Sequence, residues 1–343
     1  MRQVVCHAFD QPVRLMLREG AMPSLAPGHV RVRVAAAGVN FADHLQARNL
    51  YQEKLTPPFV CGFECYGRVE EGPGKGSWVL CSQPSAFADV VDAPLDHVFT
   101  LPREAPNAHE AAALLVAYGT AHLALHERAK AKPGDWVLVT AASGGVGSVR
   151  SCKHAHAHTH VAQAAVQLAK LAGCKVIAAA GGRTKLAKAV AMGADATLDY
   201  TATATVRDVR DALLDATDGR GVDVVLDMVG GDVLFEGICR AMAFNGRLCI
   251  VGFAGGIPKA KPNLALVRNF DLLGVYWGAY FNAGPAARDV LQRTMSDVLG
   301  SYDAGRLRPA VAKVFAPAQA QEALDAVASR GTAGKVVIDF ANM

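Results

Sequence analysis

The sequence predicts an α/β protein of two domains, a β-rich domain followed by a doubly wound parallel sheet. Three observations support this prediction. A chain of 343 residues is long for one core and sufficient for two domains. Its first third holds short extended segments separated by proline and glycine, which is typical of irregular antiparallel β structure. From about residue 108, strands and helices alternate, which is typical of a parallel sheet with helices on both faces.

The elements expected along the chain follow from periodicity. Residues 30–35 (VRVRVA) alternate apolar and basic side chains and predict a half-buried strand, and residues 108–128 are Ala/Leu-rich and predict a helix. The later expected strands are 136–140, 175–180, 222–229, 247–251 and 272–277, and the helices are 166–172, 184–192 and 233–242. A long helix after residue 285 and a last strand at 335–340 suggest that the C-terminus rejoins the first domain.

The composition limits the classes of function. The 35 basic and 31 acidic residues give a formal net charge of +4 and form no run of like charge, so no nucleic-acid or membrane-surface footprint is expected. No apolar stretch is long enough to span a bilayer, and no targeting segment is apparent. The eight cysteines are scattered without a C-x-x-C, which predicts reduced thiols and a cytoplasmic protein.

A glycine-rich turn directly follows the expected strand at 136–140. It reads AASGGVG and ends with Gly144, Gly145, Val146 and Gly147. Glycines let the backbone approach a pyrophosphate, and the N-terminus of a following helix offers free N–H groups. The spacing is A-x-x-G-x-x-G rather than G-x-G-x-x-G, so an ordinary strand-to-helix turn is the alternative. We interpret the segment as a dinucleotide-binding loop.

The end of the next strand indicates which nicotinamide cofactor is bound. An NAD site needs an acid there for the ribose, whereas an NADP site needs a cation for the 2′-phosphate. The strand ends in AAAGG and is followed by Arg183 and Lys185, with no acid. Cations at a helix N-terminus oppose the helix dipole, so they need another reason to be there. We therefore predict NADPH, with a solvated first helical turn as the alternative.

Segments spread over essentially the whole chain resemble one family, the zinc-free quinone oxidoreductases, which are the ζ-crystallin-like branch of the medium-chain dehydrogenase/reductases. The segments that carry this resemblance are AAGVN (36–40), FVCGFE (59–64), LLVAYGTAHLAL (114–125), VTAASGGVG (139–147), AAVQLAKLAGCKVIAAAGG (164–182), KAVAMGADATLDY (188–200) and GKVVI (334–338).

The resemblance implies a GroES-like catalytic domain made of residues 1–115 and 286–343, with a Rossmann domain, residues 116–285, inserted between them. It also implies NADPH as hydride donor, a small-molecule acceptor and a homodimer. The family's active-site Asn and Tyr correspond to Asn40 and Tyr51. The cofactor-binding residues expected from the motif and the resemblance together are Thr120, Gly144, Gly145, Val146, Gly147, Arg183, Lys185, Tyr200, Gly252, Phe253 and Arg330.

The resemblance further implies activity without zinc. The zinc-containing relatives place Cys, His and Cys where this chain has Asn40, Phe63 and Val116, and Phe and Val cannot ligate a metal. Without a Lewis acid, alcohol oxidation loses the means to form an alkoxide at neutral pH, whereas hydride delivery to an electron-poor acceptor needs less help. The expected acceptors are therefore quinones or other electron-poor conjugated compounds.

Asn40 and Tyr51 are expected to donate hydrogen bonds to the acceptor oxygen as negative charge develops. A capped turn and a packed surface aromatic are the alternatives for these two residues. Glu64 is interpreted as a buried hydrogen-bonding partner, with a direct role as its alternative. For the whole protein, the alternatives are an enoyl-thioester or alkenal/enone reductase, and a non-catalytic dinucleotide-binding or structural protein.

Two departures from the family pattern stand out. Near residues 72–87, the family's Gly-Asp-Arg-Val stretch is shortened and GSWV (76–79) takes its place. Fifteen residues, 149–163 (VRSCKHAHAHTHVAQ), separate the glycine loop from its helix, and without them Gly147 and Arg183 lie 21 positions apart, near the roughly 20 expected.

The inserted segment 149–163 is rich in histidine. His154, His156, His158 and His160 could hold a transition metal together with Cys152, but a solvated surface loop is the expected structure and no metal site is predicted. We hypothesise that the segment is a retained intron or a gene-model error. A genuine loop is the alternative, and sequencing the mature transcript distinguishes the two.

Overall fold

A computed structural model of the chain describes residues 1–9, 13–82, 84–141, 159–329 and 334–341. The chain forms two compact units. The terminal unit comprises Met1–Gly119 and Gly278–Met343, and the central unit comprises Thr120–Trp277. The expected domain boundaries, after residues 115 and 285, differ from these divisions by a few residues.

The terminal unit is built mainly from antiparallel strands. Its larger sheet has the order β15-β16-β3-β5-β6-β8, with β7 also paired to β3, and its smaller sheet has the order β2-β1-β4. The strands are β1 (Arg2–Cys6), β2 (Leu15–Glu19), β3 (His29–Val39), β4 (Phe59–Val60), β5 (Glu64–Glu71), β6 (Trp78–Ser82), β7 (Val90–Pro94), β8 (Val98–Thr100), β15 (Val311–Phe315) and β16 (Lys335–Asp339).

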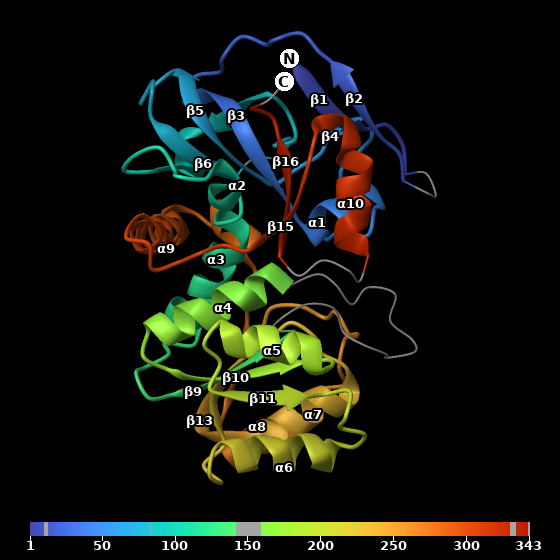
Figure 1. Cartoon of the computed structure of the whole chain (residues 1–343), viewed down its shortest axis with the longest axis vertical. Helices are drawn as coiled ribbons and strands as arrows, with labels where there is room; N and C mark the ends of the chain where they lie inside the picture. Colours follow the sequence, from blue (N-terminus) through green and yellow to red (C-terminus); the bar gives the residue numbers. More distant parts are fainter. Residues whose placement is uncertain (10–12, 83, 142–158, 330–333, 342–343) are drawn as a thin grey trace. The chain divides into compact units, whose positions relative to one another are not determined.

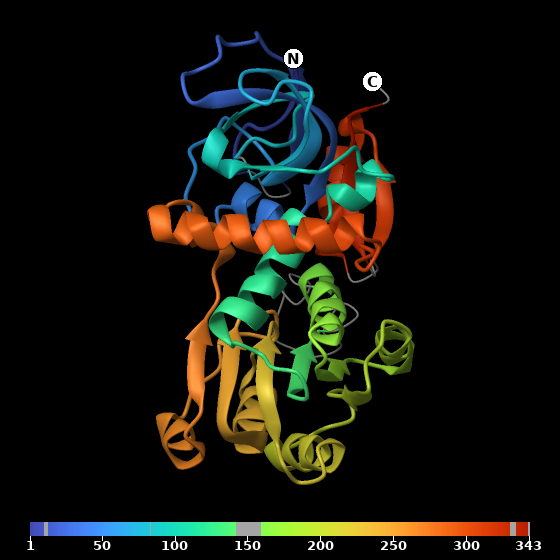
Figure 2. The same ribbon diagram turned by 90° about the vertical axis from the view of Figure 1, so that its left-hand side faces the viewer.

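The helices of the terminal unit are short except for one. They are α1 (Phe41–Ala47), η1 (Leu95–His97), α2 (Ala108–Ala111), α9 (Pro285–Asp303), η4 (Pro317–Gln319) and α10 (Ala320–Ala328), and Figure 2 shows the long α9 from its side. Two helices cross the division between the units, α3 (Leu115–His122) and η3 (Trp277–Phe281).

The C-terminal strand returns to the first part of the chain, as the sequence predicted. β16 pairs antiparallel with β3, with Val336 opposite Val39 and Ile338 opposite Ala37, and the two strands lie side by side in Figure 1. This register brings Lys335, the first residue of β16, next to the end of β3. The pairing therefore joins residues almost 300 positions apart at the place where β3 leads into α1.

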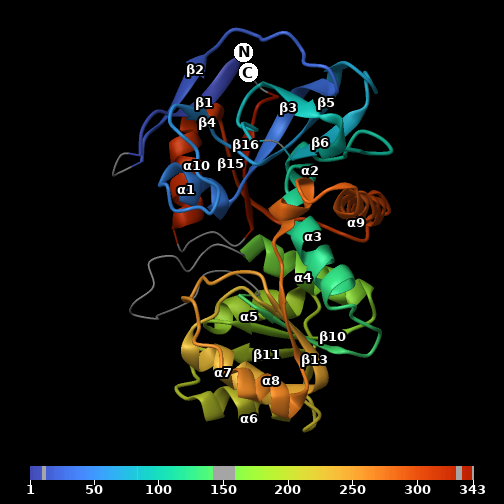
Figure 3. The same cartoon turned by 180° about the vertical axis from the view of Figure 1, so that it is seen from behind.

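The central unit is a parallel sheet of six strands in the order β11-β10-β9-β12-β13-β14. In chain order this is 3-2-1-4-5-6, the doubly wound arrangement of dinucleotide-binding domains. Helices α4 and α5 cover one face of the sheet, and α7 and α8 lie on the other face (Figures 1 and 3). The strands are β9 (Trp136–Thr140), β10 (Lys175–Ala180), β11 (Ala196–Asp199), β12 (Val222–Asp227), β13 (Met242–Ile250) and β14 (Asp271–Gly274).

The helices of the central unit connect these strands. They are η2 (Leu123–Arg128), which is a π-helix, α4 (Thr159–Leu171), α5 (Arg183–Ala191), α6 (Val206–Ala216), α7 (Asp232–Ala241) and α8 (Pro262–Arg268). The fold class is therefore α/β, as predicted. The expected helix at 108–128 is divided into α2, α3 and η2, and the strand expected at 247–251 already begins at residue 242.

The end of the histidine-rich segment requires a correction. We expected a solvated loop over 149–163, but residues 159–163 form the start of α4, where His160, Val161 and Ala162 are buried. Alanine and an apolar face oriented toward the sheet favour the helix there. Cys152, His154, His156 and His158 lie outside the described residues.

The remaining expectations about the chain as a whole concern cysteines and membranes. Each cysteine of the described ranges is a buried free thiol, as the scattered spacing predicted. Among the helices that the structure describes, none is both long enough and apolar enough to cross a bilayer.

Candidate functional site

A buried polar cluster lies in the terminal unit where β3 ends. Asn40 follows β3 and precedes the first residue of α1, and its extended backbone conformation is that of an N-cap. Its backbone N–H donates to Asp43 Oδ2 at 2.6 Å, which is one half of a capping box. The alternative interpretation of Asn40 as part of a capped turn is therefore correct as local structure, and it leaves the Asn40 side chain available for other contacts.

The Asn40 side chain forms a closed network with two buried ionic side chains. Lys335 Nζ donates to Asn40 Oδ1 at 2.7 Å and to Glu64 Oε1 at 2.5 Å, while Asn40 Nδ2 donates to Glu64 Oε1 at 2.9 Å. The exposed fractions are 5% for Asn40, 0% for Glu64 and 1% for Lys335. Burying two charges is costly unless they pair and their remaining groups form hydrogen bonds, and both conditions hold here.

This network determines the orientation of the Asn40 amide. An ammonium can only donate, so the atom that faces Lys335 is the amide oxygen, and a carboxylate can only accept, so the atom that faces Glu64 is the amide nitrogen. The second contact of Nδ2 is with the Gly38 carbonyl oxygen at 3.3 Å. Reversing the amide would place a donor against the Lys335 donor and an acceptor against each of the two acceptor oxygens.

Close packing around Gly38 keeps the cluster compact. A Cβ atom at this position would lie 2.4 Å from the Ala112 carbonyl oxygen, 2.7 Å from Glu64 Oε1 and 2.8 Å from Lys335 Cε. Only glycine lets β3 approach these groups so closely. Within the AAGVN segment, Gly38 therefore has a clear structural role in addition to Asn40.

Asp43 adds a second carboxyl group to the cluster. It is buried, and Oδ1 has no hydrogen-bond partner among the residues the structure describes. Burial raises the pKa of Asp43 to about 7, although the Asn40 backbone N–H and the charge of Lys335 act in the opposite direction. The cluster thus contains one ammonium and two carboxyl groups, and the Asp43 carboxyl is the one whose charge burial disfavours.

The three positions at which the resemblance implies ligands in zinc-containing relatives lie around Glu64. Asn40 donates to it, Phe63 precedes it in the chain, and the Val116 backbone N–H donates to Glu64 Oε2 at 2.9 Å. The Tyr51 and Phe63 rings are in contact, with centroids 5.5 Å apart. Within the described ranges, no group of three His, Cys, Asp or Glu side chains could hold a metal.

In the central unit, the candidate nucleotide site lies at the carboxyl ends of the strands. The strand order reverses between β9 and β12, and ligands of doubly wound sheets bind at such a point. Asp227, at the end of β12, is buried and accepts hydrogen bonds from Thr140 Oγ1 at 3.0 Å and from the N–H groups of Val229 and Gly230. Its backbone oxygen accepts from Gly252, so Asp227 fixes the turns that follow β12 and β13.

The carboxyl end of β10 carries no acid, and α5 begins there with the exposed Arg183. The nearest acid to this turn is Asp199, at the end of β11, whose carboxylate accepts from the N–H of Gly182 at 3.1 Å and from Thr201. The Tyr200 hydroxyl is buried, and burial raises the pKa of the phenol. The Gly181 backbone N–H acts on the phenol oxygen and opposes this rise, but no acceptor for the Tyr200 O–H is found in the part of the chain described, so the hydroxyl has a donor to offer a ligand.

The other expected cofactor residues divide into two groups. Thr120 is buried in α3, Lys185 lies in the first turn of α5, and Gly252 and the partly exposed Phe253 follow β13. Gly144, Gly145, Val146, Gly147 and Arg330 lie outside the described residues. Their assignment, like that of the other site residues, stays a prediction.

Sequence reasoning did not single out Lys335, Asp43 or Asp227. Lys335 stands in the GKVVI segment as one lysine before an apolar strand, which carries no signal of burial by itself. Asp43 lies three residues after Asn40, so the capping-box spacing was the available signal. Asp227 ends an otherwise apolar strand at the carboxyl edge of the sheet, where ligands bind, and this position was its signal.

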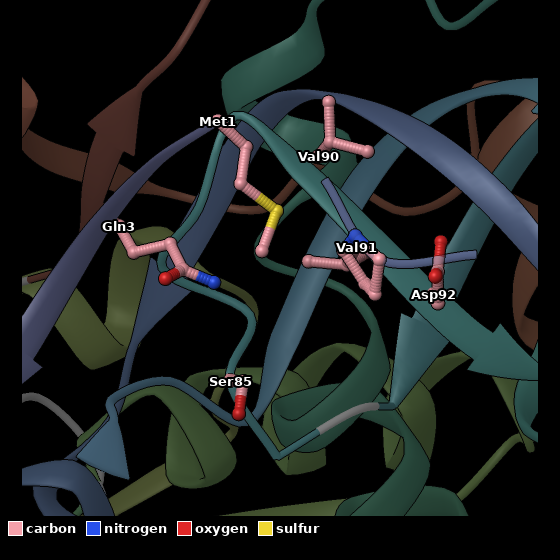
Figure 4. Close-up of a pocket in the computed structure, with 7 residues that line it drawn as sticks. Met1, Gln3, Ser85, Val90, Val91 and Asp92 are labelled. Carbon is pink, nitrogen blue, oxygen red and sulfur yellow. The ribbon is translucent and has the colours of Figure 1, made fainter. Parts of the chain in front are cut away.

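Two surface hollows of the terminal unit contain none of these residues. The smaller, of about 80 Å³, is shown in Figure 4, where Met1, Val90 and Val91 line it. The larger, of about 690 Å³, is lined by side chains of both charge signs, including Arg33 and Glu70, which form an ion pair. Neither hollow bears on the predicted chemistry.

The chain is similar to known proteins along its whole length. A family model described as "Alcohol dehydrogenase GroES-like domain" matches residues 26–102, and one described as "Zinc-binding dehydrogenase" matches residues 161–293. The quinone oxidoreductase-like protein 2 of Mus musculus is 36% identical over 99% of this chain and 92% of its own length. Its homologue from Nematostella vectensis is 34% identical over 98% of this chain and 88% of its own.

A solved structure extends this similarity to the fold. The quinone oxidoreductase of Thermus thermophilus, whose structure is also known as a complex with NADPH, has a TM-score of 0.81 and 32% identity, covering 99% of this chain and all of that one. The 2-haloacrylate reductase of a Burkholderia species is 29% identical over 97% of both chains. The GroES-like and Rossmann domains expected from the sequence are confirmed.

Proposed function

The chain belongs to the quinone oxidoreductase branch of the medium-chain dehydrogenase/reductases, and we propose that this oxidoreductase uses NADPH to reduce quinones or other electron-poor conjugated acceptors without zinc. The observation that carries the proposal is the side-chain set around Glu64. An amide stands at one of the three positions where zinc-containing relatives are expected to carry ligands, two apolar residues stand at the others, and an ammonium donates to the amide oxygen. Such a site can stabilise developing negative charge on an acceptor oxygen, but it offers no Lewis acid to an alcohol.

The residues of the central unit fit NADPH. The carboxyl end of β10 has no acid, Arg183 is exposed at the start of α5, and the buried Tyr200 hydroxyl has a donor to offer. Arg183, Lys185 and Tyr200 would hold the 2′-phosphate, and the turns fixed by Asp227 would hold the rest of the dinucleotide. When bound, NADPH supplies a hydride.

The proposed function is tested by NADPH oxidation with a panel that contains a quinone, an enone and an enoyl thioester. We expect turnover with the quinone or the enone, and the same rate after exhaustive treatment with a chelator. Turnover with the thioester alone would favour the enoyl-thioester reductase. NADPH binding without any turnover would favour a non-catalytic dinucleotide-binding protein.

Cofactor preference gives the first prediction. Replacing Arg183 and Lys185 by Ala together should weaken NADPH binding by about 10- to 100-fold, because charge-assisted hydrogen bonds to the 2′-phosphate are lost. NADH binding should change little. The measurement is equilibrium binding of both cofactors, and Arg207→Ala/Arg210→Ala on the exposed side of α6 controls for the loss of two positive charges. An equal loss of affinity for NADPH and NADH would contradict the assignment of Arg183 and Lys185 to the 2′-phosphate.

We also propose a homodimer, formed through the β14 edge of the central unit. In the described part of the chain, β14 pairs only with β13, which leaves its outer hydrogen-bonding groups unpaired. Nearby in the sequence, Leu266 and Val267 of α8 are 81% and 74% exposed. Adjacent apolar side chains on an exposed helix are unusual unless they meet a partner.

The dimer is tested by the mass of the protein in solution. In size-exclusion chromatography with light scattering, the wild-type protein should have a mass twice that of the chain. Leu266→Glu/Val267→Glu should lower this mass toward that of the monomer, because charged side chains disrupt an apolar contact. Val190→Glu, on the 54% exposed Val190 of α5, is the matched control and should remain dimeric. A monomeric wild type, or a dimer in the double variant, contradicts this assignment.

A further inference from the structure

Lys335 is a buried cation whose ammonium donates to two side chains of the candidate site. It begins β16, whose following residues, Val336 to Ile338, belong to the apolar core. Its ammonium donates to Asn40 Oδ1 and to Glu64 Oε1. An ammonium so far from water is costly and is rare unless it is paired. Glu64 balances its charge, and the additional bond satisfies a second ammonium hydrogen while placing the cation directly against the Asn40 oxygen.

The bond from Lys335 changes the chemistry of the Asn40 amide. A cation that donates to the oxygen of an amide draws electron density from the nitrogen, so the Nδ2 hydrogens become stronger donors. One of these hydrogens is held by Glu64 at 2.9 Å. The other contacts the Gly38 carbonyl at 3.3 Å, the longest contact of the network and hence its weakest. This second hydrogen is the one that a ligand oxygen can take over.

We propose that Lys335 is a positioning residue that holds and polarises the Asn40 amide for the oxygen of the acceptor. The inference rests on the proposed function. In the reduction of a conjugated carbonyl, the hydride adds to the carbon β to the carbonyl, the π electrons shift onto the carbonyl oxygen, and a proton from solvent completes the product. The positive charge of Lys335 acts on that oxygen through the amide, and Glu64 keeps both donors in place.

The inference predicts that the loss caused by neutralising the pair depends on the acceptor. In Glu64→Gln/Lys335→Met no unpaired charge remains, and kcat should fall about 10- to 100-fold with an enone but less than about 10-fold with a strongly electron-poor quinone, whose reduced oxygen needs less stabilisation. Glu64→Gln alone retains the Lys335 cation, so both rates should fall by a similar factor and their ratio should stay as in the wild type. Lys313→Met, on the exposed Lys313 of β15, is the control for the same substitution.

A binding measurement gives a second readout that does not depend on turnover. With NADP⁺ present, wild-type protein should bind 4-nitrophenolate more tightly than nitrobenzene, and Glu64→Gln/Lys335→Met should lose this preference by about 10-fold. If that variant does not fold, Glu64→Gln/Lys335→Gln replaces it, because Gln can still donate to Asn40 without a charge.

The outcomes separate the inference from the proposed function. An equal loss of rate with every acceptor, together with an unchanged preference for the phenolate, would show that Lys335 is only structural. If wild-type protein turns over no acceptor, the proposed function fails, and the phenolate preference still decides the role of Lys335.

Discussion

Replacing Lys335 by Met should lower the free energy of unfolding of the terminal unit by about 3–5 kcal/mol, the usual effect of removing one partner of a buried ion pair. Glu64 would keep two neutral donors, Asn40 Nδ2 and the Val116 N–H, but no opposite charge within hydrogen-bonding distance. The carboxylate is fully buried, so water cannot replace the lost ammonium.

The loss at Lys335 should be recovered largely by a second substitution. Glu64→Gln/Lys335→Met contains no unpaired charge, and replacing both partners of a buried pair is often close to neutral. Urea denaturation followed by the fluorescence of Trp78 measures this, in a Trp136→Phe/Trp277→Phe background, because Trp78 is then the one tryptophan of the chain. Lys313→Met should change stability by less than about 0.5 kcal/mol. A Lys335→Met variant as stable as Lys313→Met would mean that Glu64 does not depend on Lys335.

Local patterns were sufficient to predict much of the fold. The bounds of β9 and β10 agree with the sequence prediction to the residue, because each is a short apolar run between polar or glycine-containing turns. The return of the last strand was also predicted from the order of the elements. Its antiparallel register with β3 was not, and this register is what brings Lys335 to Asn40, 295 positions away.

The start of α4 shows why the family motif that begins at residue 164 did not give the correct start of this helix. The resemblance resumes at residue 164, so the inserted segment was taken to end at 163, but a helix needs a first turn before its buried stretch. Thr159 to Gln163 supply that turn, and Val161 and Ala162 contribute to the buried face. The helix boundary therefore follows from packing against the sheet, which a comparison of motifs does not measure.

For the site, the sequence indicated the residue types and the structure supplied their partners. Asn40, Tyr51 and Glu64 were each considered from the motifs that contain them, but the charge that faces Asn40 comes from the far end of the chain. The raised pKa of Asp43 is likewise a result of burial, which no local pattern around residue 43 specifies.

Replacing Asp43 by Asn should make the terminal unit more stable than wild type at pH 8 but not at pH 4. The folded-state pKa is raised to about 7 from an ordinary value of 3.8. Below pH 3.8 both states hold the proton, and between the two values the unfolded state releases it while the folded state retains it. Wild-type stability therefore falls as the pH rises through this window, by at most about 4 kcal/mol from this one group.

The asparagine in Asp43→Asn would not titrate, and its side-chain oxygen could still accept the Asn40 backbone N–H. The variant should thus gain stability over wild type progressively from about pH 4 to pH 8, as measured by urea denaturation with Trp78 fluorescence.

Asp208 provides the matched control, because it occupies the same capping-box position in α6, but it is exposed and the Thr205 N–H and hydroxyl lower its pKa. Asp208→Asn should lose stability relative to wild type as the pH rises, since the wild-type contribution is present above the ordinary pKa and is lost on acidification. If the stability of both variants relative to the wild type changes in the same direction with pH, the Asp43 carboxyl is charged in the folded protein at neutral pH. Its burial and the missing partner of Oδ1 indicate instead that it is neutral there.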